Sequence, residues 1–367
     1  DREREREMEE EEMAHGWAAR DSTGVLSPFT FPLRAMKGDD ITLKVLYCGI
    51  CLTDLCTIKN YWRNANYPVI PGHEIVGVVA QVGREVHKFK IGDKVGVGYM
   101  AGACRSCDNC RADDENYCPE LVRVFNSFYP DGSKTYGGFA DTVVVNEHFA
   151  VRVPETLPLY KVGPLLCAGI TVYTPMKQHG LAQPGKHLGV VGLGGLGHLA
   201  VKFGKAFGLR VTIISSTPHK EKDAVELLGA DSFIVISNAE QMKVSSAAAG
   251  TMDHIISTSA GALSLSPLVA LLKTHGKIIV VGTSIKPMEI SSFDLVSGGK
   301  SIVGSMIGGM KVAQEMMEFA GEHSVTPEVE VVRMQDVNLA MERLEKGDVR
   351  YRFVVDVANA FHHSRGV

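Results

Sequence analysis

Four cysteines lie close together in the sequence and follow the pattern C-x2-C-x2-C-x7-C. They are Cys104, Cys107, Cys110 and Cys118. Three cysteines at every third residue leave a loop too short for all of them to pair as disulfides. All three can turn inward around one zinc ion, however, and the fourth then completes a tetrahedron. A closed site of four thiolates has no open position, so the spacing predicts a structural zinc that holds a lobe of the chain in shape.

The composition is that of a globular protein. The chain has 367 residues, 45% of them hydrophobic and 22% charged, and a formal net charge of -4. This length suggests two or three domains, and the slightly acidic balance offers no basic surface for nucleic acid. No apolar run approaches the roughly 18 residues that span a bilayer. Since no apolar signal segment is visible, we expect a reducing, cytoplasmic location in which the eight cysteines are free or metal-bound rather than paired in disulfides.

Two kinds of sequence pattern divide the chain into regions. Residues 16–167 show short β-type runs broken by Gly and Pro, which predicts a compact, barrel-like β domain. Between residues 168 and 308, strand and helix patterns alternate, which predicts a doubly wound parallel sheet and hence an α/β fold. Residues 309–367 resemble a return to the first domain. Residues 1–15, which include the charge run DREREREMEEEEM, are expected to form a charged, disordered tail.

A glycine-rich stretch between an apolar strand and a helical pattern predicts a dinucleotide site. The stretch reads Gly192, Leu193, Gly194, Gly195, Leu196, Gly197 and fits G-x-G-x-x-G. In this pattern Gly192 allows the tight turn, Gly194 lets the pyrophosphate approach the backbone, and Gly197 lets helix and strand pack closely. The helix N-terminus then offers amide donors to the phosphates.

The next strand ends without the acidic residue that an NAD site usually places there. Its last residues lead into Ser215, Ser216, Thr217, Pro218, His219 and Lys220, and no Asp or Glu occurs from His198 to Lys220. A carboxylate would repel the 2′-phosphate of NADP, whereas hydroxyls and an ammonium group would hold it. We therefore predict NADPH over NADH, with Ser215, Ser216 and Lys220 as contacts. The alternative is that Lys220 is a solvated lysine at a helix start.

Further metal donors are scattered along the chain. Cys48, Cys51, Cys56 and Cys167 remain after the cluster is assigned, and His73 lies in the run PGHE. Spacing alone cannot pair such distant residues, and a lone His or Cys is more often part of a core.

Several long stretches carry a resemblance to a known family. They are CGICLTD, YPVIPGHEIVGVV, PLLCAGITVY, VGLGGLGHLAVKFGKAFG and AMERLEKGDVRYRFVVDV. With the cysteine cluster, they resemble the zinc-dependent medium-chain alcohol dehydrogenases, within them the plant cinnamyl alcohol dehydrogenase group, from about Gly16 to Val357. The resemblance implies a GroES-like catalytic domain and a Rossmann domain. It also implies catalytic zinc ligands at Cys51, His73 and Cys167, and a carboxylate at Glu74 that can approach the zinc.

The family resemblance implies two zinc ions per subunit, one catalytic and one structural, with NADP(H) as the hydride carrier. Three protein ligands leave a catalytic zinc one open position, where it would act as a Lewis acid toward a carbonyl oxygen. Thr53 matches the hydroxyl of the family's proton relay, and Thr171 matches a position beside the cofactor. The resemblance also implies a homodimer that pairs the edge strand predicted at Ser301–Ser305.

The sequence departs from the family at several positions. Leu52 and Cys56 stand where relatives often carry histidines, and a thiol is a poor proton shuttle at neutral pH. Arg123 and Met306 replace Trp and Phe of the lignin-forming members. The candidate residues of the substrate pocket are Trp62, Tyr99, Arg123, Thr283 and Met306. These departures favour an enzyme of specialised metabolism.

Three hypotheses follow from this reasoning. The leading one is an NADPH-dependent zinc alcohol dehydrogenase that acts on a bulky hydrophobic aldehyde, cinnamyl-type or terpenoid. A second keeps the fold but reduces an iminium or a conjugated alkene in terpenoid indole alkaloid biosynthesis. The retained Cys51, His73 and Cys167 favour carbonyl chemistry over this alternative. A third, disfavoured by the complete cofactor motif, is a zinc-dependent binding protein without catalysis.

Overall fold

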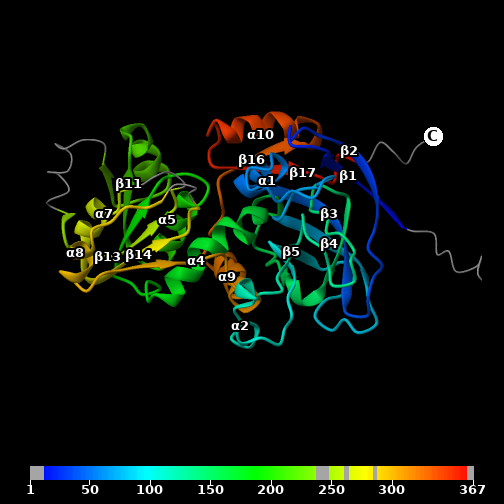
Figure 1. The fold of residues 1–367 in the computed structure, drawn as a ribbon, viewed down its shortest axis with the longest axis horizontal. Helices are drawn as coiled ribbons and strands as arrows, with labels where there is room; N and C mark the ends of the chain where they lie inside the picture. Colours follow the sequence, from blue (N-terminus) through cyan, green and yellow to red (C-terminus); the bar gives the residue numbers. More distant parts are fainter. Residues whose placement is uncertain (1–11, 237–247, 260–263, 284–286, 362–367) are drawn as a thin grey trace, which may run out of the picture. The chain divides into compact units, whose positions relative to one another are not determined.

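The structure is a computed structural model that describes residues 12–236, 248–259, 264–283 and 287–361. The chain divides into two compact units (Figure 1). The first unit comprises the chain up to Cys167, together with Gly309–Gly321 and the segment from Glu328 onward. The second comprises Ala168–Gly308 and Glu322–Pro327. Within the described part, no helix is both long and apolar enough to cross a membrane.

A seven-stranded sheet forms the centre of the first unit. Six strands follow the order β16-β17-β3-β4-β5-β9, and β8 pairs with β3. Their bounds are β3 Asp40–Ile50, β4 Ile75–Val82, β5 Lys94–Val97, β8 Thr142–Asn146, β9 Ala150–Arg152, β16 Val329–Arg333 and β17 Arg352–Asp356. The predicted β character of this part of the chain is confirmed. A short pair, β6 (Met100–Gly102) and β7 (Val122–Arg123), leads into and out of the cysteine-rich segment.

The prediction of a disordered tail over residues 1–15 is wrong for its last residues, which begin a strand. Strand β1 spans Met13–Ala19 and pairs antiparallel with β2, Leu26–Pro32. Small side chains explain the difference, because Ala14 is buried and Gly16 lies where an added Cβ would meet the carbonyl oxygen of Phe139 at 2.9 Å. The hairpin therefore begins within residues that the charge pattern had assigned to the tail.

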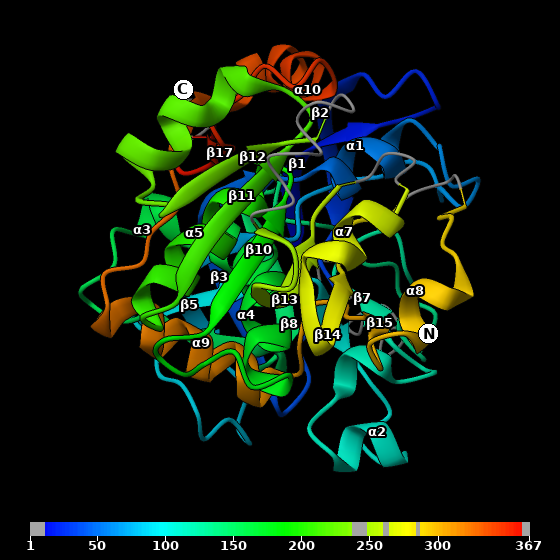
Figure 2. The same ribbon diagram turned by 90° about the vertical axis from the view of Figure 1, so that its left-hand side faces the viewer.

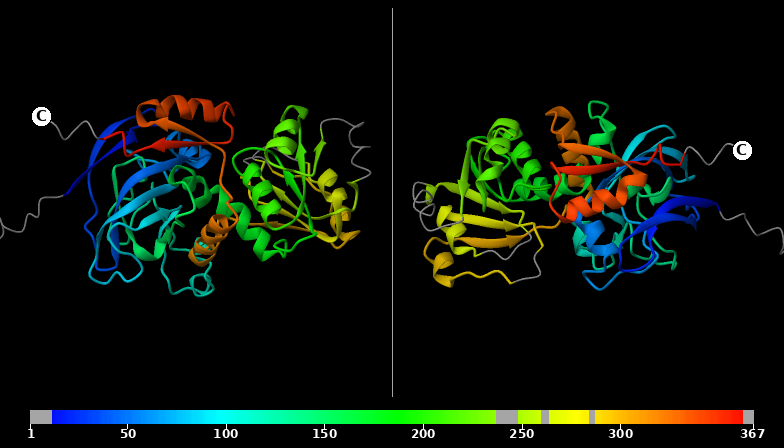
Figure 3. Two further views of the ribbon diagram at one scale, coloured as in Figure 1. Left: turned by 180° about the vertical axis from the view of Figure 1, so that it is seen from behind. Right: turned by 90° about the horizontal axis from the view of Figure 1, so that it is seen from above.

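Short helices complete the first unit. They are α1 (Leu52–Ile58), α2 (Asp108–Arg111), α3 (Leu159–Val162), α9 (Met310–Glu322) and α10 (Val337–Glu345). Helix α10 packs on β16 and α1, so the last part of the chain covers the start of the first unit (Figure 3). Strand β17 runs antiparallel to β3, with Phe353 opposite Ile50. This pairing places the C-terminal segment beside the residues that follow β3.

The second unit contains a six-stranded, wholly parallel sheet in the order β12-β11-β10-β13-β14-β15 (Figure 2). The strands are β10 His187–Val191, β11 Arg210–Ser215, β12 Ser232–Val235, β13 Met252–Ser257, β14 Leu272–Val280 and β15 Ser301–Gly304. The helices are α4 (Ala168–Gln178), α5 (Gly197–Ala206), α7 (Ser266–Leu271) and α8 (Ser292–Val296), with a π-helical turn at Asp223–Leu227. The predicted alternation of strands and helices is confirmed among the described residues.

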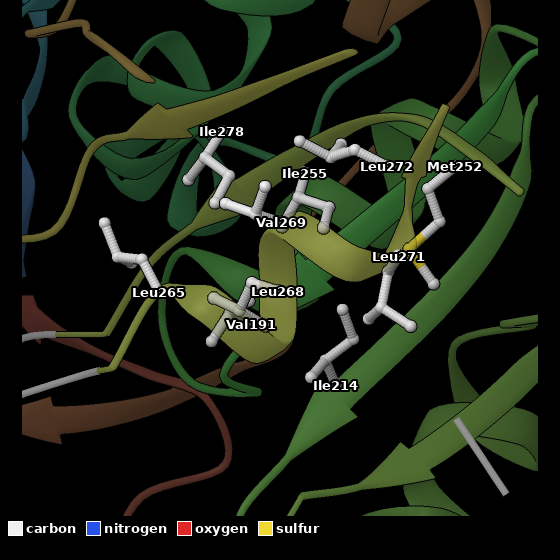
Figure 4. Close-up of a cluster of buried hydrophobic side chains, with 10 residues drawn as sticks. All are labelled: Val191, Ile214, Met252, Ile255, Leu265, Leu268, Val269, Leu271, Leu272 and Ile278. Carbon is white, nitrogen blue, oxygen red and sulfur yellow. The ribbon is translucent and has the colours of Figure 1, made fainter. Parts of the chain in front are cut away.

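The core of the second unit lies under α7. Figure 4 shows its side chains, which come from α7 and from four strands of the sheet. The cluster comprises Val191, Ile214, Met252, Ile255, Leu265, Leu268, Val269, Leu271, Leu272 and Ile278. Val191 ends β10 and Ile214 lies one residue before the end of β11. The core thus extends to the carboxyl ends of the strands, where parallel sheets bind their ligands.

Candidate metal centres and nucleotide site

One group of metal-donating side chains lies in the first unit and joins residues distant in sequence. Cys51 follows β3, His73 and Glu74 precede β4, and Cys167 follows a 3-10 turn at Gly163–Leu166. The Sγ atoms of Cys51 and Cys167 lie 3.9 Å apart, and His73 Nε2 lies 3.2 Å from Cys167 Sγ. Tetrahedral zinc requires sulfurs about 3.8 Å apart and a sulfur–nitrogen distance of about 3.6 Å. The donor set and its spacing therefore fit a zinc ion.

The charges in this group also call for a cation. The hydrogen-bonding contact between the two thiols lowers the pKa of Cys51 well below its usual range, while the same contact and burial raise the pKa of Cys167. Two buried thiols this close cannot both ionise unless a positive charge lies between them. A divalent cation bound by these residues would supply that charge.

Asp54, on α1, holds two of the candidate ligands and the loop before His73 through hydrogen bonds. Its side chain is fully buried and accepts hydrogen bonds from the backbone N–H of Cys51 at 2.8 Å and of Gly72 at 2.9 Å. The same carboxylate lies 2.9 Å from His73 Nδ1. In the neutral imidazole, a hydrogen bond from Nδ1 to Asp54 would leave Nε2 unprotonated and 3.2 Å from Cys167 Sγ, as a metal ligand requires. Asp54 was missed in the sequence, although it is the last residue of the CGICLTD stretch.

Glu74 is a buried carboxylate whose counter-charge comes from the far end of the chain. Arg352, on β17, donates to Glu74 Oε1, and both side chains are almost wholly buried. Glu74 Oε2 has no hydrogen-bond partner among the described residues. Burial raises the pKa of Glu74 to about 7, and Arg352 opposes that shift. A free carboxylate oxygen within reach of the three ligands is the arrangement that the family resemblance implied. No sequence pattern pointed to this role of Arg352.

Other predicted residues of the first unit lie around this group. Thr53 Oγ1 lies 3.7 Å from Cys51 Sγ. Cys56, one turn further along α1, has its pKa raised by burial and by the neighbouring Cys51, so it does not release a proton near neutral pH. The ring of Tyr99 contacts the His73 ring edge-on at 5.6 Å, and Phe125, which the sequence analysis missed, stacks on it at 5.6 Å. These rings form apolar walls beside the histidine.

The four clustered cysteines converge at a second group. Cys104, Cys107, Cys110 and Cys118 present sulfur atoms that all lie within 4.8 Å of one another. The Cys104 Sγ atom lies 3.9 Å from Cys110 Sγ and 3.5 Å from Cys118 Sγ. All eight cysteines of the chain are free thiols. Distances of this size are too long for a disulfide and suit four ligands of one zinc ion.

Backbone donors favour thiolates in the second group. Backbone N–H groups of Ser106 and Cys107 lower the pKa of Cys104 to about 6. Burial and the neighbouring thiols raise the pKa of Cys110 to about 12. One thiol with a lowered pKa beside another with a raised pKa is what a cluster of thiols shows before a cation allows all of them to ionise. The local amides and the sulfurs thus fit a metal that carries no open position.

The glycine-rich turn has the geometry that its pattern predicts. Gly192 has φ +87°, a conformation that side chains rarely adopt. A Cβ on Gly197 would lie 2.1 Å from the Gly192 carbonyl oxygen, whereas one on Gly194 would meet nothing within 4 Å. Gly192 therefore makes the turn, Gly197 permits the close packing of α5, and Gly194 leaves its backbone open to a ligand. Gly195 and Leu196 complete the turn before α5.

A cavity of about 360 Å³ opens beside this turn. Val191, Gly192, Leu193, Ile214, Ser215, Ser216, Thr217, His219, Lys220, Ile236, Ser259, Ser264, Pro267 and Leu268 line it. The lining contains apolar residues, several hydroxyls and two basic side chains. This combination suits an adenine ring and a phosphate-bearing ribose. No described lining residue is acidic.

The remaining predicted site residues are placed as follows. Trp62 and Arg123 belong to the first unit, where the Arg123 guanidinium donates to the Asn126 carbonyl at 3.0 Å. Thr171 is buried on α4 of the second unit, and Thr283 and Met306 are exposed in that unit.

Family models match most of the chain. The alcohol dehydrogenase GroES-like domain matches residues 37–155, and the zinc-binding dehydrogenase model matches residues 195–322. A probable cinnamyl alcohol dehydrogenase 9 of Oryza sativa subsp. japonica is 59% identical over 96% of this chain and 98% of its own. The chain belongs to the zinc-dependent medium-chain alcohol dehydrogenases. Its place is in the plant cinnamyl alcohol dehydrogenase-like group.

Further relatives and solved structures support the same family. An 8-hydroxygeraniol dehydrogenase of Catharanthus roseus is 56% identical over 96% of this chain and 97% of its own. A cinnamyl alcohol dehydrogenase structure from Sorghum bicolor has a TM-score of 0.92 at 56% identity, over 95% of this chain and 99% of that one. A CAD from Helicobacter pylori complexed with NADP(H) has a TM-score of 0.87 at 34% identity, with the same coverage. The expected GroES-like and Rossmann folds are thereby confirmed.

Proposed function

We propose that this dehydrogenase uses NADPH and zinc to reduce the carbonyl group of a bulky hydrophobic aldehyde, of the cinnamyl or terpenoid type, in specialised metabolism. The observation that carries the proposal is the group of Cys51, His73 and Cys167, which offers three ligands at zinc distances and an unpaired carboxylate oxygen of Glu74 close by. When bound there, zinc would supply Lewis-acid chemistry, and NADPH would supply the hydride.

The chain's own residues contribute positioning and proton transfer. Asp54 fixes the tautomer of His73, and the buried Glu74–Arg352 pair sets the charge behind the ligands. Thr53, whose hydroxyl lies beside Cys51, is the group that would pass a proton to the reduced oxygen. Tyr99 and Phe125 beside His73 exclude water and favour an apolar substrate.

The preference for NADPH is supported by the cavity in the second unit. Ser215, Ser216 and Lys220 line it, and no acidic residue does so among those described. We expect Ser216→Asp to lower the NADPH to NADH ratio of kcat/KM on the order of 30- to 100-fold, because a carboxylate would repel the 2′-phosphate and bind the ribose hydroxyls. Ser22→Asp, at an exposed serine of the first unit, is the matched control. A wild-type enzyme that uses NADH as well as NADPH would contradict the proposal.

A substrate panel tests the reaction itself. We expect cinnamaldehydes or geranial-type aldehydes to give alcohols with NADPH, with the product identified by mass and by retention of the conjugated double bond. Strictosidine-derived iminium species and conjugated enals reduced at the alkene form the competing arm. Turnover in that arm alone, or carbonyl reduction that survives Cys167→Ala, would overturn the proposal.

We also propose a homodimer in a reducing compartment such as the cytoplasm. Strand β15 lies at the edge of the six-stranded sheet, and α8 just before it exposes Phe293 and Val296. Pairing of two such edges would cover them. Light scattering should give twice the mass of one chain, and a monomer at micromolar concentration would contradict this arrangement. The free thiols support the reducing location.

A further inference from the structure

The cavity beside the glycine-rich turn has two basic side chains in its lining, and they differ in what they already bind. Lys220 donates from Nζ to the carbonyl oxygen of Leu193 at 2.8 Å, so its ammonium group is tied to the turn itself. Lys220 therefore helps to hold the peptide between Gly192 and Gly194 in place. Only part of its hydrogen-bonding capacity remains for a ligand.

The His219 side chain, unlike that of Lys220, is not held by a hydrogen bond to the glycine-rich turn. The side chain is exposed at the cavity and forms no hydrogen bond or ion pair with any residue that the structure describes. It lies in a 3-10 turn, Pro218–Lys220, that follows directly on β11. The Thr217 backbone N–H donates to Ser215 Oγ at 3.2 Å, and Pro218 fixes its own φ and restricts Thr217 before it to an extended conformation, so the turn that presents His219 is locally ordered.

We propose that His219 is a second cation for the adenosine 2′-phosphate and makes the preference for NADP(H) over NAD(H) depend on pH. The inference rests on the proposed use of NADPH. A protonated imidazole beside the Ser215 and Ser216 hydroxyls gives the phosphate a donor that Lys220, held by Leu193, provides only in part. NAD(H) has no phosphate there, so the same proton does little for it.

The charged groups near His219 lie on its own segment of the chain. On its own segment the charged neighbours are Lys220, Glu221 and Lys222, and Lys222 pairs with Glu226. The described lining from the other elements contains no ionisable side chain. Histidine changes its charge between about pH 5 and 8, whereas lysine stays charged throughout this range.

The phosphate titrates in the same range and must be separated from His219. A phosphate monoester gains its second negative charge near pH 6, which strengthens its attraction to Lys220 as the pH rises. Loss of the proton from His219 acts in the opposite direction. The pH dependence of the wild-type protein alone therefore mixes two effects, and the ratio of wild type to a variant without the imidazole isolates the contribution of His219.

The experiment is calorimetric titration of the full-length protein with 2′,5′-ADP and with 5′-AMP at pH 6.0 and 8.5. For 2′,5′-ADP we expect His219→Gln to bind about three- to tenfold more weakly than wild type at pH 6.0 and equally at pH 8.5. His219→Lys should match wild type at pH 6.0 and bind more tightly than wild type at pH 8.5. Binding of 5′-AMP should not change in either variant.

Two failures can be told apart. If His219→Gln matches wild type at pH 6.0 while 2′,5′-ADP still binds better than 5′-AMP, the role of His219 is refuted and the NADPH preference stands. If wild type binds 2′,5′-ADP no better than 5′-AMP at either pH, the proposed cofactor preference itself fails. His87→Gln, at an exposed histidine of the first unit, should behave as wild type; a change there would mark the effect as general and also refute the inference.

Discussion

Replacing Asp54 by asparagine changes one buried carboxylate on which three donors converge. Those donors are the backbone N–H groups of Cys51 and Gly72 and the ring Nδ1 of His73, all at 2.8 to 2.9 Å. Asparagine has nearly the same shape but carries no charge, and one of its two terminal atoms is an NH2 group. In any orientation this NH2 group faces at least one of the three donors.

The magnitude follows from these contacts. One charge-assisted hydrogen bond, worth about 1.5 to 3 kcal/mol, is lost, and the others become neutral. A buried donor left without an acceptor adds to the cost. We expect the free energy of unfolding to fall by about 2 to 4 kcal/mol. Because Asp54 also orients His73, the affinity of the first metal group should fall about 10- to 100-fold.

The assay is the release of zinc to a chromophoric chelator, followed with thermal unfolding of the zinc-loaded protein. We expect one zinc of Asp54→Asn to leave faster than in wild type and the other to leave at the wild-type rate. The matched control is Asp348→Asn, since the Asp348 side chain is 70% exposed, pairs with Arg343 and belongs to neither metal group. If Asp54→Asn releases both ions at wild-type rates and unfolds at the wild-type temperature, the positioning role is refuted.

Other changes test the structural metal, the glycine turn and a buried histidine. Cys107→Ser should lose one zinc and unfold at lower temperature before activity falls, and normal folding with lost turnover would contradict the division of roles. Gly197→Ala would place a Cβ 2.1 Å from the Gly192 carbonyl, so NADP+ binding measured by calorimetry should weaken at least tenfold. Burial lowers the pKa of His187, so protonation opposes folding and stability falls as the pH drops below about 6.5. In His187→Gln, which can keep a hydrogen bond to Thr212, thermal melts should show a smaller fall over this pH range.

The sequence specified those features that depend on local pattern. The glycine spacing after an apolar strand predicted the turn that the structure forms, because Gly192 and Gly197 each meet a backbone requirement that arises within these six residues. The cysteine cluster was equally local. In contrast, Cys51, His73 and Cys167 meet only through the order of the strands in the sheet, which no spacing rule reveals. Their grouping in the sequence analysis came from the family resemblance.

The role of Asp54 could not be predicted from the sequence, for a different physical reason. An acidic residue in the first turn of a helix normally reads as a capping residue, and Asp54 does accept the Cys51 backbone N–H in that role. Its second role, toward His73, depends on the close approach of another loop. Burial of a charged group cannot be read from the residues beside it, since it is decided by which distant partner arrives.

Arg352 is such a partner for Glu74, and it comes from a strand far away in the sequence. In an alternating strand, an arginine between Tyr351 and Phe353 would be assigned to the solvent face. Strand β17, however, pairs with β3 so that Phe353 lies opposite Ile50, and Arg352 reaches Glu74 with 4% of its surface exposed. A slip of one residue in this register would turn the guanidinium to the other face and leave Glu74 buried without a counter-charge, which costs several kcal/mol. The C-terminal segment therefore supplies the positive charge that pairs with Glu74 beside the candidate metal ligands. The candidate active site depends on the register of β17, because that register places Arg352 next to Glu74.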